Sequence, residues 1–448
     1  MENRYDKYKD SGIAWIGEIP EHWIMGRIKN IIHAYKAGPF GSSLITSNLN
    51  NIGKYLIYTP EHIAANTTNL DSNLYLPDYR INEMGQFEIG IGDIVFPIVG
   101  TLGRAMQITS DMPNGIINQR LSKFRLFENI ICSNYFMWIF GKSDFYKIYI
   151  DMNCRGSFIL NLTKLLIGNM PIMLPSLPEQ QSIATYLDQK CGEIDELITL
   201  QEEMITKLQS YKQSVITEAV TKGLDKNVPL KDSGIERIGE IPEHWEASKT
   251  LFNLSMPITD GPHTTPELFE IGIPFVSAEA VSFGNGRIDF SRIRGYISEN
   301  FYQECCKKYV PQVDDIYMIK SGATTGRVAI VDTDIKFTIW SPLAVFRCNK
   351  ERMLPRFLFY QLQSNGYQKQ IELNWSYGTQ QNIGMRTLEK LILSVPPLSE
   401  QQSISDYLDQ KCGEIDELIS IKQQKIEKLK DYKKSLIFEC VTGKRKVS

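Results

Sequence analysis

The thirteen residues YLDQKCGEIDELI occur twice in the chain, at 186–198 and again, unchanged, at 407–419. A second pair of stretches, DSGIAWIGEIPEHW at 10–23 and DSGIERIGEIPEHW at 232–245, is separated by nearly the same number of residues. Two long matches at nearly one offset indicate an internal repeat, the feature that decides the architecture of a chain before any other. The 448 residues therefore form two halves.

Between the repeated flanks lie two stretches, 24–174 and 246–395, that share only short landmarks. These landmarks are Gly92–Ile94 with Asp314–Ile316, Gly103–Arg104 with Gly326–Arg327, and Leu121–Arg125 with Leu343–Arg347. We interpret the two stretches as one fold that carries two different surfaces. Near-identical flanks indicate one kind of partner bound twice, and divergent middles indicate two different ligands.

Each middle stretch has the pattern of a mixed α+β domain. Short apolar runs predict strands at 94–96, 105–108, 316–319 and 328–331, and aromatic-rich runs at 135–140 and 357–360 predict helices. We therefore predict an α+β protein in four segments. They are a first domain with its leader at 1–174, a central helical spacer at 175–223, a second domain with its leader at 224–395, and a C-terminal helical spacer at 396–448.

Apolar residues recur at +4 and +3 in both spacers, which is the narrow stripe of a coiled-coil seam. The seam positions are Leu187, Cys191, Ile194, Ile198, Ile205, Leu208, Val215 and Ala219, then Leu408, Cys412, Ile415, Ile419, Ile426, Leu429, Leu436 and Cys440. Polar residues interrupt the two stripes at matching places, Lys212 with Lys433 for example, and such residues can fix the register of a coil. We expect the two helices to pair antiparallel, so that a pseudo-twofold axis relates the halves. A plain tether or dimerisation helix is the alternative.

Composition excludes several classes of protein. The charged N-terminus is not a secretory signal and no apolar run is long enough for a membrane span, so we expect a cytoplasmic protein without membrane contact. Eight cysteines with no C-x-x-C pair and five scattered histidines indicate neither a disulfide framework nor a metal site. A phosphate-binding loop is also missing, because the run 321–327 is too short and has Arg where that motif has Lys. The sequence therefore predicts a protein that is not itself an enzyme.

Net charge is −3 overall, but it is distributed unevenly. Residues 24–174 carry 13 Lys and Arg against 10 Asp and Glu, and residues 246–395 carry 16 against 15. The divergent stretches are therefore slightly basic, which permits nucleic-acid binding.

Several motifs occur in the same order in the two halves. PSLPEQQ at 175–181 and PPLSEQQ at 396–402 each lead into I-x-x-Y-L-D, and IPEHW occurs at 19–23 and 241–245. KAGPFGS at 36–42 and TDGPH at 259–263 occupy matching places. Over nearly its whole length the chain thereby resembles the specificity subunits of type I restriction–modification systems.

The resemblance implies a subunit that recognises DNA without catalysis. Each divergent domain would read one half of a bipartite, gapped site in double-stranded DNA, and the helices would set the gap and dock two methyltransferase subunits. The chain itself would hold no cofactor. S-adenosylmethionine would belong to the methyltransferase, and ATP with Mg would belong to restriction (motor-nuclease) subunits. A coiled-coil scaffold without DNA specificity and a standalone DNA-binding regulator are the alternatives.

Candidate DNA contacts are polar or basic residues of the divergent domains, because Arg and Lys suit guanine or phosphate and Asn and Gln suit adenine. They are Lys36, Ser42, Ser43, Arg104 and Arg155 in the first domain, and His263, Thr264, Thr265, Thr324, Thr325, Arg327, Tyr377, Gln380 and Gln381 in the second. The first domain has apolar residues at 158–160 where the second has Gln380 and Gln381, so this contact is expected in the second domain alone. His22 and His244 lie in the repeated leaders, which favours a packing or capping role.

Overall fold

The computed structural model describes residues 4–39, 44, 49–100, 103–153, 162–377 and 381–447, with only the main chain of Tyr377. It divides into two compact units, of which the first is made of two separate stretches of the chain and the second of one continuous stretch. The first unit contains residues 1–201 and 424–448, and the second contains residues 202–423. Each unit therefore joins one divergent domain to part of both long helices.

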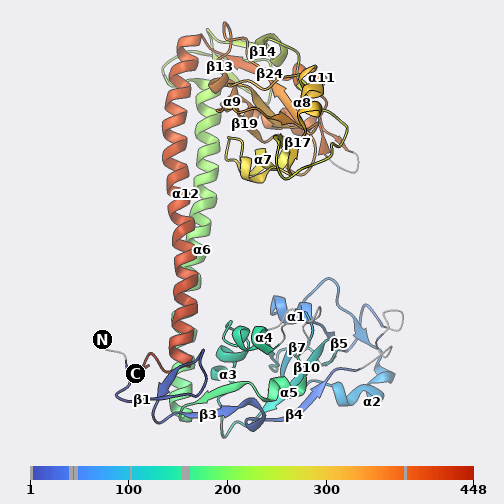
Figure 1. Cartoon of the computed structure of the whole chain (residues 1–448), viewed down its shortest axis with the longest axis vertical. Coiled ribbons are helices and arrows are strands. Elements are labelled where there is room, and N and C mark those ends of the chain that lie inside the picture. The colour runs from blue at the N-terminus through green and yellow to red at the C-terminus, as the bar shows by residue number, and fades with distance from the viewer. Residues whose placement is uncertain are drawn as a thin grey trace. The chain divides into compact units, whose positions relative to one another are not determined.

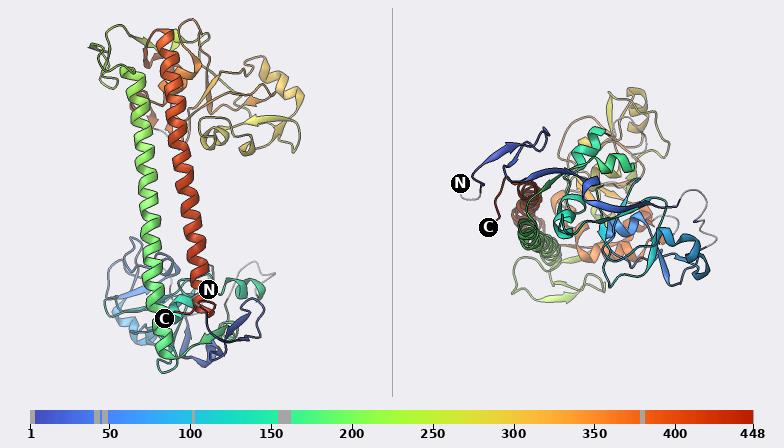
Figure 2. Two further views of the ribbon diagram at one scale, coloured as in Figure 1. Left: turned by 90° about the vertical axis from the view of Figure 1, so that its left-hand side faces the viewer. Right: turned by 90° about the horizontal axis from the view of Figure 1, so that it is seen from below.

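Two long helices, α6 (Leu177–Lys222) and α12 (Leu398–Val441), connect the domains. With 46 residues α6 is about 69 Å long, at ~1.5 Å per residue. Within each unit the segments of α6 and α12 run antiparallel, side by side (Figures 1 and 2). Gly223 and Gly443 follow the helix ends with φ of 76° and 71°, a left-handed conformation that glycine adopts without strain. The predicted α+β fold with paired antiparallel helices is confirmed.

The described residues of the first domain form a four-stranded sheet, a three-stranded sheet and a two-stranded pair of Ile24–Arg27 with Pro171–Leu174. A four-stranded antiparallel sheet has the order β4-β10-β7-β8, and a three-stranded sheet has the order β6-β5-β9 with a parallel β5–β9 pair. The strands are β3 (Ile24–Arg27), β4 (Ile32–Ala37), β5 (Tyr55–Tyr58), β6 (Tyr75–Leu76), β7 (Ile94–Pro97), β8 (Met106–Gln107), β9 (Gly115–Ile117), β10 (Leu121–Leu126) and β11 (Pro171–Leu174). The helices are α1 (Pro60–Ala65), α2 (Ile81–Met84), α3 (Ser133–Phe140), α4 (Lys147–Asn153) and α5 (Lys164–Gly168).

The second domain repeats this topology with different side chains. Its four-stranded sheet has the order β15-β21-β18-β19, and its three-stranded sheet has the order β17-β16-β20 with a parallel β16–β20 pair. The strands are β14 (Glu246–Lys249), β15 (Thr259–Asp260), β16 (Ile273–Val276), β17 (Tyr296–Ile297), β18 (Ile316–Ile319), β19 (Val328–Ile330), β20 (Thr338–Ile339), β21 (Leu343–Phe346), β22 (Ser376–Tyr377), β23 (Gln381–Asn382) and β24 (Ile392–Val395). The helices are α7 (Ala278–Phe283), α8 (Glu299–Cys306), α9 (Pro355–Gln363), α10 (Asn365–Leu373) and α11 (Met385–Lys390).

A short leader hairpin precedes each domain, and its last residues are buried. The hairpins are β1 (Tyr8–Asp10) with β2 (Glu18–Pro20), and β12 (Leu230–Asp232) with β13 (Glu240–Pro242). Trp23 and Trp245 follow the hairpins, and both are almost completely buried. In each unit the core that contains this tryptophan also contains buried residues of α6 and of α12. In each unit the leader, part of the domain and both helices thus share one core, while further apolar clusters lie within the domain.

Candidate nucleic-acid interface

The Gly-Pro loops follow the edge strands β4 and β15 in the two domains. Gly38 packs against the main-chain carbonyl of Asn118, and Gly261 packs in the same way against the carbonyl of Ile339, so a Cβ at either glycine would collide with main chain. The motif therefore requires glycine because two main-chain segments approach closely. Lys36, just before the first loop, donates to Gln86 Oε1 at 2.5 Å and lies over the ring of Phe87. Ser42 and Ser43 lie outside the described residues.

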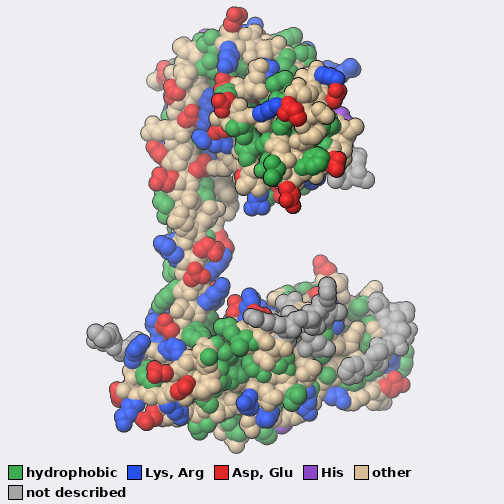
Figure 3. All heavy atoms as spheres, in the orientation of Figure 1, with side chains coloured by type: hydrophobic (Ala, Val, Ile, Leu, Met, Phe, Trp, Pro, Cys, Tyr) green, Lys and Arg blue, Asp and Glu red, His purple; other side chains and the backbone are tan. Residues whose placement is uncertain are grey.

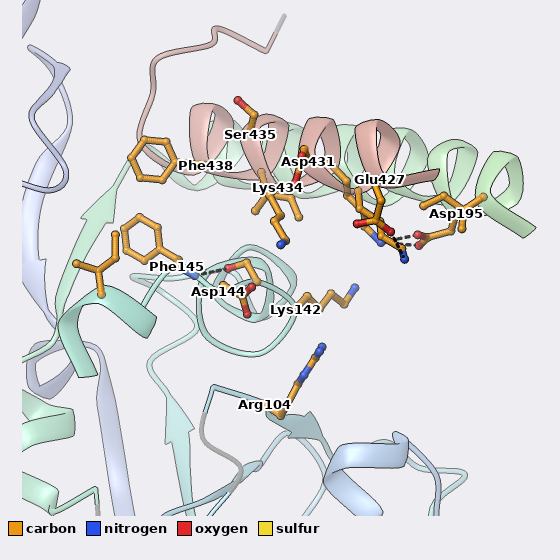
Figure 4. A pocket seen from close by; sticks show the side chains of 16 residues that line it. Arg104, Lys142, Asp144, Phe145, Asp195, Glu427, Asp431, Lys434, Ser435 and Phe438 are labelled. Carbon is orange, nitrogen blue, oxygen red and sulfur yellow. Dashed lines mark hydrogen bonds and ion pairs between the residues drawn. The ribbon is translucent and has the colours of Figure 1, made fainter. Parts of the chain in front are cut away.

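Arg104 lies beside β8, at the opposite edge of the sheet from the strand of Lys36, so the structure does not bring these two residues together. Its exposed side chain lines a groove of about 700 Å³ between the first domain and the helices of the first unit. Lys142 and Lys434 extend into the same groove (Figure 4). The groove also contains Asp144, Asp195, Glu427 and Asp431, so its charge is mixed. Arg155 lies outside the described residues.

In the second domain a buried carboxylate gathers three basic side chains. Asp260 is 1% exposed, and its oxygens contact the Lys308 ammonium, His263 Nε2 at 3.1 Å and Lys320 Nζ at 3.4 Å. Burial is the strongest influence and raises the pKa of Asp260, but the hydrogen bond to Lys308 and the neighbouring charges together hold that pKa below its ordinary value. Asp260 is therefore ionised at neutral pH. Thr264 and Thr265 follow as exposed residues of the same loop.

The loop between β18 and β19 adjoins the hairpin β22–β23. Gly322 N donates to Gln381 O at 2.9 Å, which holds the loop against the hairpin. Ser282 Oγ donates to Thr324 Oγ1 at 3.0 Å, and Arg327 Nη1 donates to the carbonyl of Ser282 at 3.0 Å. The structure thus groups Thr324, Arg327 and Gln381, while Thr325 uses its hydroxyl inside the loop, where it donates to Gly322 O at 2.7 Å. Gln380 and the side chain of Tyr377 lie outside the described residues.

Two of the landmarks shared by the domains form an ion pair in each, between a buried aspartate and a partly exposed arginine. Arg125 contacts Asp93 through Nε at 3.0 Å and Nη2 at 2.7 Å. Arg347 contacts Asp315 through Nε and Nη2, both at 2.7 Å, and Tyr309 also donates to Asp315 at 2.5 Å. These pairs lie in matching places and support the fold. The shared landmarks were visible in the sequence, but their pairing was not predicted.

The glutamate of each Glu-Gln-Gln motif holds the leader. Glu179 accepts hydrogen bonds from Tyr5 OH at 2.6 Å and Trp23 Nε1 at 3.1 Å, and it contacts His22 Nε2 at 3.1 Å. Glu400 likewise accepts from Trp245 Nε1 at 3.0 Å and contacts His244 Nε2 at 2.7 Å. Burial, followed by Glu179, raises the pKa of Tyr5 well above its ordinary value.

The first glutamine of each motif holds the domain. Gln180 is fully buried, accepts from Cys132 N at 2.7 Å, and donates to the carbonyls of Ile130 at 3.1 Å and Pro175 at 3.0 Å. Gln401 accepts from Leu354 N at 2.8 Å and donates to the carbonyls of Arg352 at 2.7 Å and Pro396 at 2.9 Å. We name Glu179 with Gln180, and Glu400 with Gln401, the sockets. The sequence showed the motif but not these long-range contacts.

The predicted seam residues are buried or half-buried on α6 and α12. They are Leu187, Cys191, Ile194, Ile198, Ile205, Leu208, Val215, Ala219, Leu408, Cys412, Ile415, Ile419, Ile426, Leu429, Leu436 and Cys440. Within each unit a lysine of one helix also pairs with an aspartate of the other, Lys433 with Asp195 and Lys212 with Asp416.

A second set of large apolar residues on the helices is exposed. It contains Leu197, Leu200 and Tyr432 in the first unit, and the matching Leu418, Ile421 and Tyr211 in the second. Figure 3 shows hydrophobic side chains interspersed with charged ones along the surface of the helix pair. We name this set the outer stripe.

Within the described residues no three His, Cys, Asp or Glu side chains lie close enough together to hold a metal ion. The helices of that part of the chain also include none with the length and apolar character of a membrane span.

The solved structures most relevant to the fold share it at low sequence identity. A chain described under "Structural basis underlying complex assembly and conformational transition of the type I R-M system" has a TM-score of 0.68 at 18% identity and covers 95% of this chain and 99% of itself. The HsdS subunit from Thermoanaerobacter tengcongensis has a TM-score of 0.51 at 16% identity, with 95% and 98% covered.

Curated relatives agree with this likeness. A putative type I restriction enzyme MjaX specificity subunit from Methanocaldococcus jannaschii is 27% identical over 96% of both chains. The type I restriction enzyme EcoBI specificity subunit from Escherichia coli is 22% identical over 73% of this chain and 69% of its own. The family model described as "Type I restriction modification DNA specificity domain" matches twice, at residues 20–209 and 262–431. The chain therefore belongs to the family of type I restriction–modification DNA specificity subunits, which recognise DNA and are not themselves catalytic.

Proposed function

We propose that this chain selects a bipartite DNA site for a type I restriction–modification complex. Each divergent domain reads one half of the site, and the helices fix the number of base pairs between the halves. The observation that carries this proposal is the contrast between the sockets and the domains they hold. Glu179 with Gln180 and Glu400 with Gln401 make matching contacts to the leader tryptophan and to the main chain of the domain, whereas the domains differ at most of the candidate contacts.

Two methyltransferase subunits dock on the helices in this proposal. The outer stripe supports this role because the two units present matching apolar residues, Leu197 with Leu418 and Leu200 with Ile421. Exposed apolar residues grouped on one surface are typical of protein interfaces. An identical segment in each unit suits two copies of one partner, since both copies would meet the same side chains.

The chemistry of the complex belongs to its other subunits in this proposal. The methyltransferase supplies S-adenosylmethionine chemistry and takes the target adenine out of the stack, because a base inside a duplex is out of reach of an enzyme. Restriction subunits supply ATP-dependent translocation and cleavage with Mg. This chain holds the register on the host DNA, which places the complex in the cytoplasm.

The test is a long-read methylation map of host DNA, made with the native chain and with residues 24–174 exchanged for another recognition domain. We expect one arm of a gapped methyladenine motif to change while the other arm and the gap stay constant. The reciprocal exchange of residues 246–395 should change the other arm alone. If methylation remains active and neither exchange alters the motif, the chain does not choose the site, and the scaffold alternative replaces this proposal.

A further inference from the structure

The Asp260 cluster is an unusual arrangement of charge for a protein surface. One buried carboxylate faces three basic groups, those of His263, Lys308 and Lys320, so the cluster has a positive excess even when His263 is neutral. A buried carboxylate is unfavourable unless cations or hydrogen bonds compensate for its lost hydration. Among the described residues no donor meets Asp260 Oδ2 with hydrogen-bond geometry. His263 and Lys320 therefore stand near that oxygen without being fully engaged by it.

The basic groups of the cluster reach solvent to different extents. The side chain of His263 is 72% exposed and that of Lys308 is 50% exposed, whereas that of Lys320 is 13% exposed. A cavity of about 180 Å³ opens beside Lys308, and its lining also includes Asp260, Gly261, Thr264 and Glu304. The carboxylate of Glu304 forms an ion pair with Lys307, so its charge is balanced outside the cluster. The cluster can thus meet a ligand from solvent without moving the buried carboxylate.

The first domain builds the same sheet without this aspartate. Ala37 pairs with Ser122 on the edge strand β4, and Asp260 pairs with Ala344 at the matching place on β15. Since Ala37 supports the fold in one domain, the fold does not require a carboxylate there. The cluster therefore belongs to the divergent surface of the second domain.

The cluster is continuous with the candidate DNA contacts of that domain. Lys320 directly precedes the loop that carries Thr324. Its carbonyl accepts a hydrogen bond from Ile383 N at 2.9 Å, next to the hairpin that carries Gln381. Phosphate contacts orient a protein on the duplex, while neighbouring contacts to base edges supply specificity. The positive cluster is suited to phosphate contacts, and the polar loop beside it is suited to contacts with base edges.

We propose that His263, Lys308 and Lys320 bind the phosphodiester backbone of the half-site that the second domain reads, and that Asp260 is the residue that positions them. This inference rests on the proposed function. The Asp260 cluster would then orient the DNA duplex on the second domain, and the first domain has no such cluster at the matching place.

The test measures the affinity of the assembled methyltransferase complex for a duplex with its mapped motif, and for a scrambled duplex, over a series of salt concentrations. Replacing Lys308 by Gln should reduce the slope of log affinity against log salt by about 0.9, the value for one lost phosphate contact. Lys320→Gln should reduce it similarly, with the methylated motif unchanged. Lys307→Gln is the matched control, because it removes the same charge from the neighbouring residue, which pairs with Glu304 instead. It should leave the slope unchanged.

The Asp260→Asn variant tests whether Asp260 positions the basic groups, because positioning and overall charge predict opposite changes in DNA affinity. Removal of a negative charge strengthens DNA binding if only overall charge matters, whereas loss of positioning weakens it, here on the order of tenfold. A wild-type complex that does not prefer its motif over the scrambled duplex overturns the proposed function. A wild-type complex with that preference, whose slope is unchanged in Lys308→Gln and Lys320→Gln, overturns this inference alone. Those two variants decide the matter even if Asp260→Asn fails to fold.

Discussion

Lys212 on α6 places its ammonium nitrogen 2.7 Å from both carboxylate oxygens of Asp416 on α12. Lys433 makes the same contact with Asp195 in the other unit, at 2.6 Å from both oxygens. Both aspartates lie in the repeated thirteen-residue segment. These pairs sit among apolar seam residues, where a polar pair favours one register over its alternatives.

Reversing one charge of this pair should destabilise the chain. Lys212→Glu places two carboxylates in contact in a partly buried position, and we expect a loss of about 2 kcal/mol in urea unfolding. The double variant Lys212→Glu, Asp416→Lys should recover most of that loss. Lys226→Glu is the control, since its ion pair with Glu218 spans 4.0 Å between exposed side chains. Equal losses in Lys212→Glu and in the double variant would show that the pair does not couple the helices.

Replacing a socket glutamine should lower the free energy of unfolding far more than replacing the glutamine that follows it. Gln401→Leu leaves the Leu354 amide and two carbonyls buried without a partner, and we expect a loss of about 2–4 kcal/mol. Gln402 is exposed and donates to Asp406 in its own helix at 2.7 Å, so Gln402→Ala should lose less than about 0.5 kcal/mol. Hydrogen exchange at Leu354 gives a direct measurement. Comparable effects of the two substitutions would contradict this account of the motif.

Removing the guanidinium of Arg347 from its ion pair with Asp315 should strongly destabilise the second domain. Arg347→Met leaves the Asp315 carboxylate uncompensated, and we expect a loss of about 3–5 kcal/mol. Lys350→Met removes an exposed pair with Asp314 and should lose less than about 1 kcal/mol. Thermal unfolding of both variants at one pH makes the comparison. A stable Arg347→Met variant would mean that Tyr309 and the main-chain amide of Gln312, which donates to Asp315 at 2.8 Å, satisfy this carboxylate without Arg347.

The outer stripe should control the stoichiometry of assembly. Leu197→Asp and Leu418→Asp each place a charge in one of the two matching apolar patches. We expect each variant to retain one methyltransferase copy and the double variant to retain none, as measured by native mass spectrometry. Thr199→Asp is the control, because it lies on the opposite side of α6 from Leu197 at ~100° per residue. Retention of two copies by the double variant would place docking elsewhere.

The seam cysteines should be inert until the coil opens. Burial raises the pKa of the Cys191 and Cys412 thiols to about 11, so few of them are thiolates at pH 8. We expect iodoacetamide to label them at least about 100-fold more slowly than in the urea-unfolded chain, as read from peptide masses. Labelling should accelerate as the pH rises toward 11. Fast labelling at pH 8 in the folded chain would show that the helices separate readily.

Local periodicity accounts for the parts of this protein that its sequence predicts well. The seam from Leu187 to Ala219 follows the helical period, and the predicted strands at 94–96 and 316–319 lie within β7 and β18. Both helices end near a glycine, Gly223 and Gly443, because glycine stops a helix through its own backbone freedom.

Contacts between residues far apart in the chain were not predictable in the same way. Nothing in the sequence around Lys308 marks it as a partner of Asp260, and the pairing depends on where α8 lies in the fold. Lys36 and Arg104 were grouped by chemistry, but the order of strands in the sheet separates them. His22 and His244 were expected to pack or cap, but the glutamate that each contacts, 156 or 157 residues farther along the chain, was not foreseen. Tertiary placement decides all of these contacts.

The sockets have a consequence for how new specificities arise. Gln180 and Gln401 bind amide and carbonyl groups of the inserted domain, and every polypeptide carries these groups. A contact to the peptide backbone places no demand on side chains, and the side chains that pack against the helices belong to the buried core rather than to the exposed surface of the domain. Mutation can therefore rewrite almost the whole face of either domain without loosening its attachment. Attachment of a domain to the helices and its choice of DNA sequence thus depend on different groups of the domain. Selection can therefore change the DNA sequence that is read without weakening the attachment.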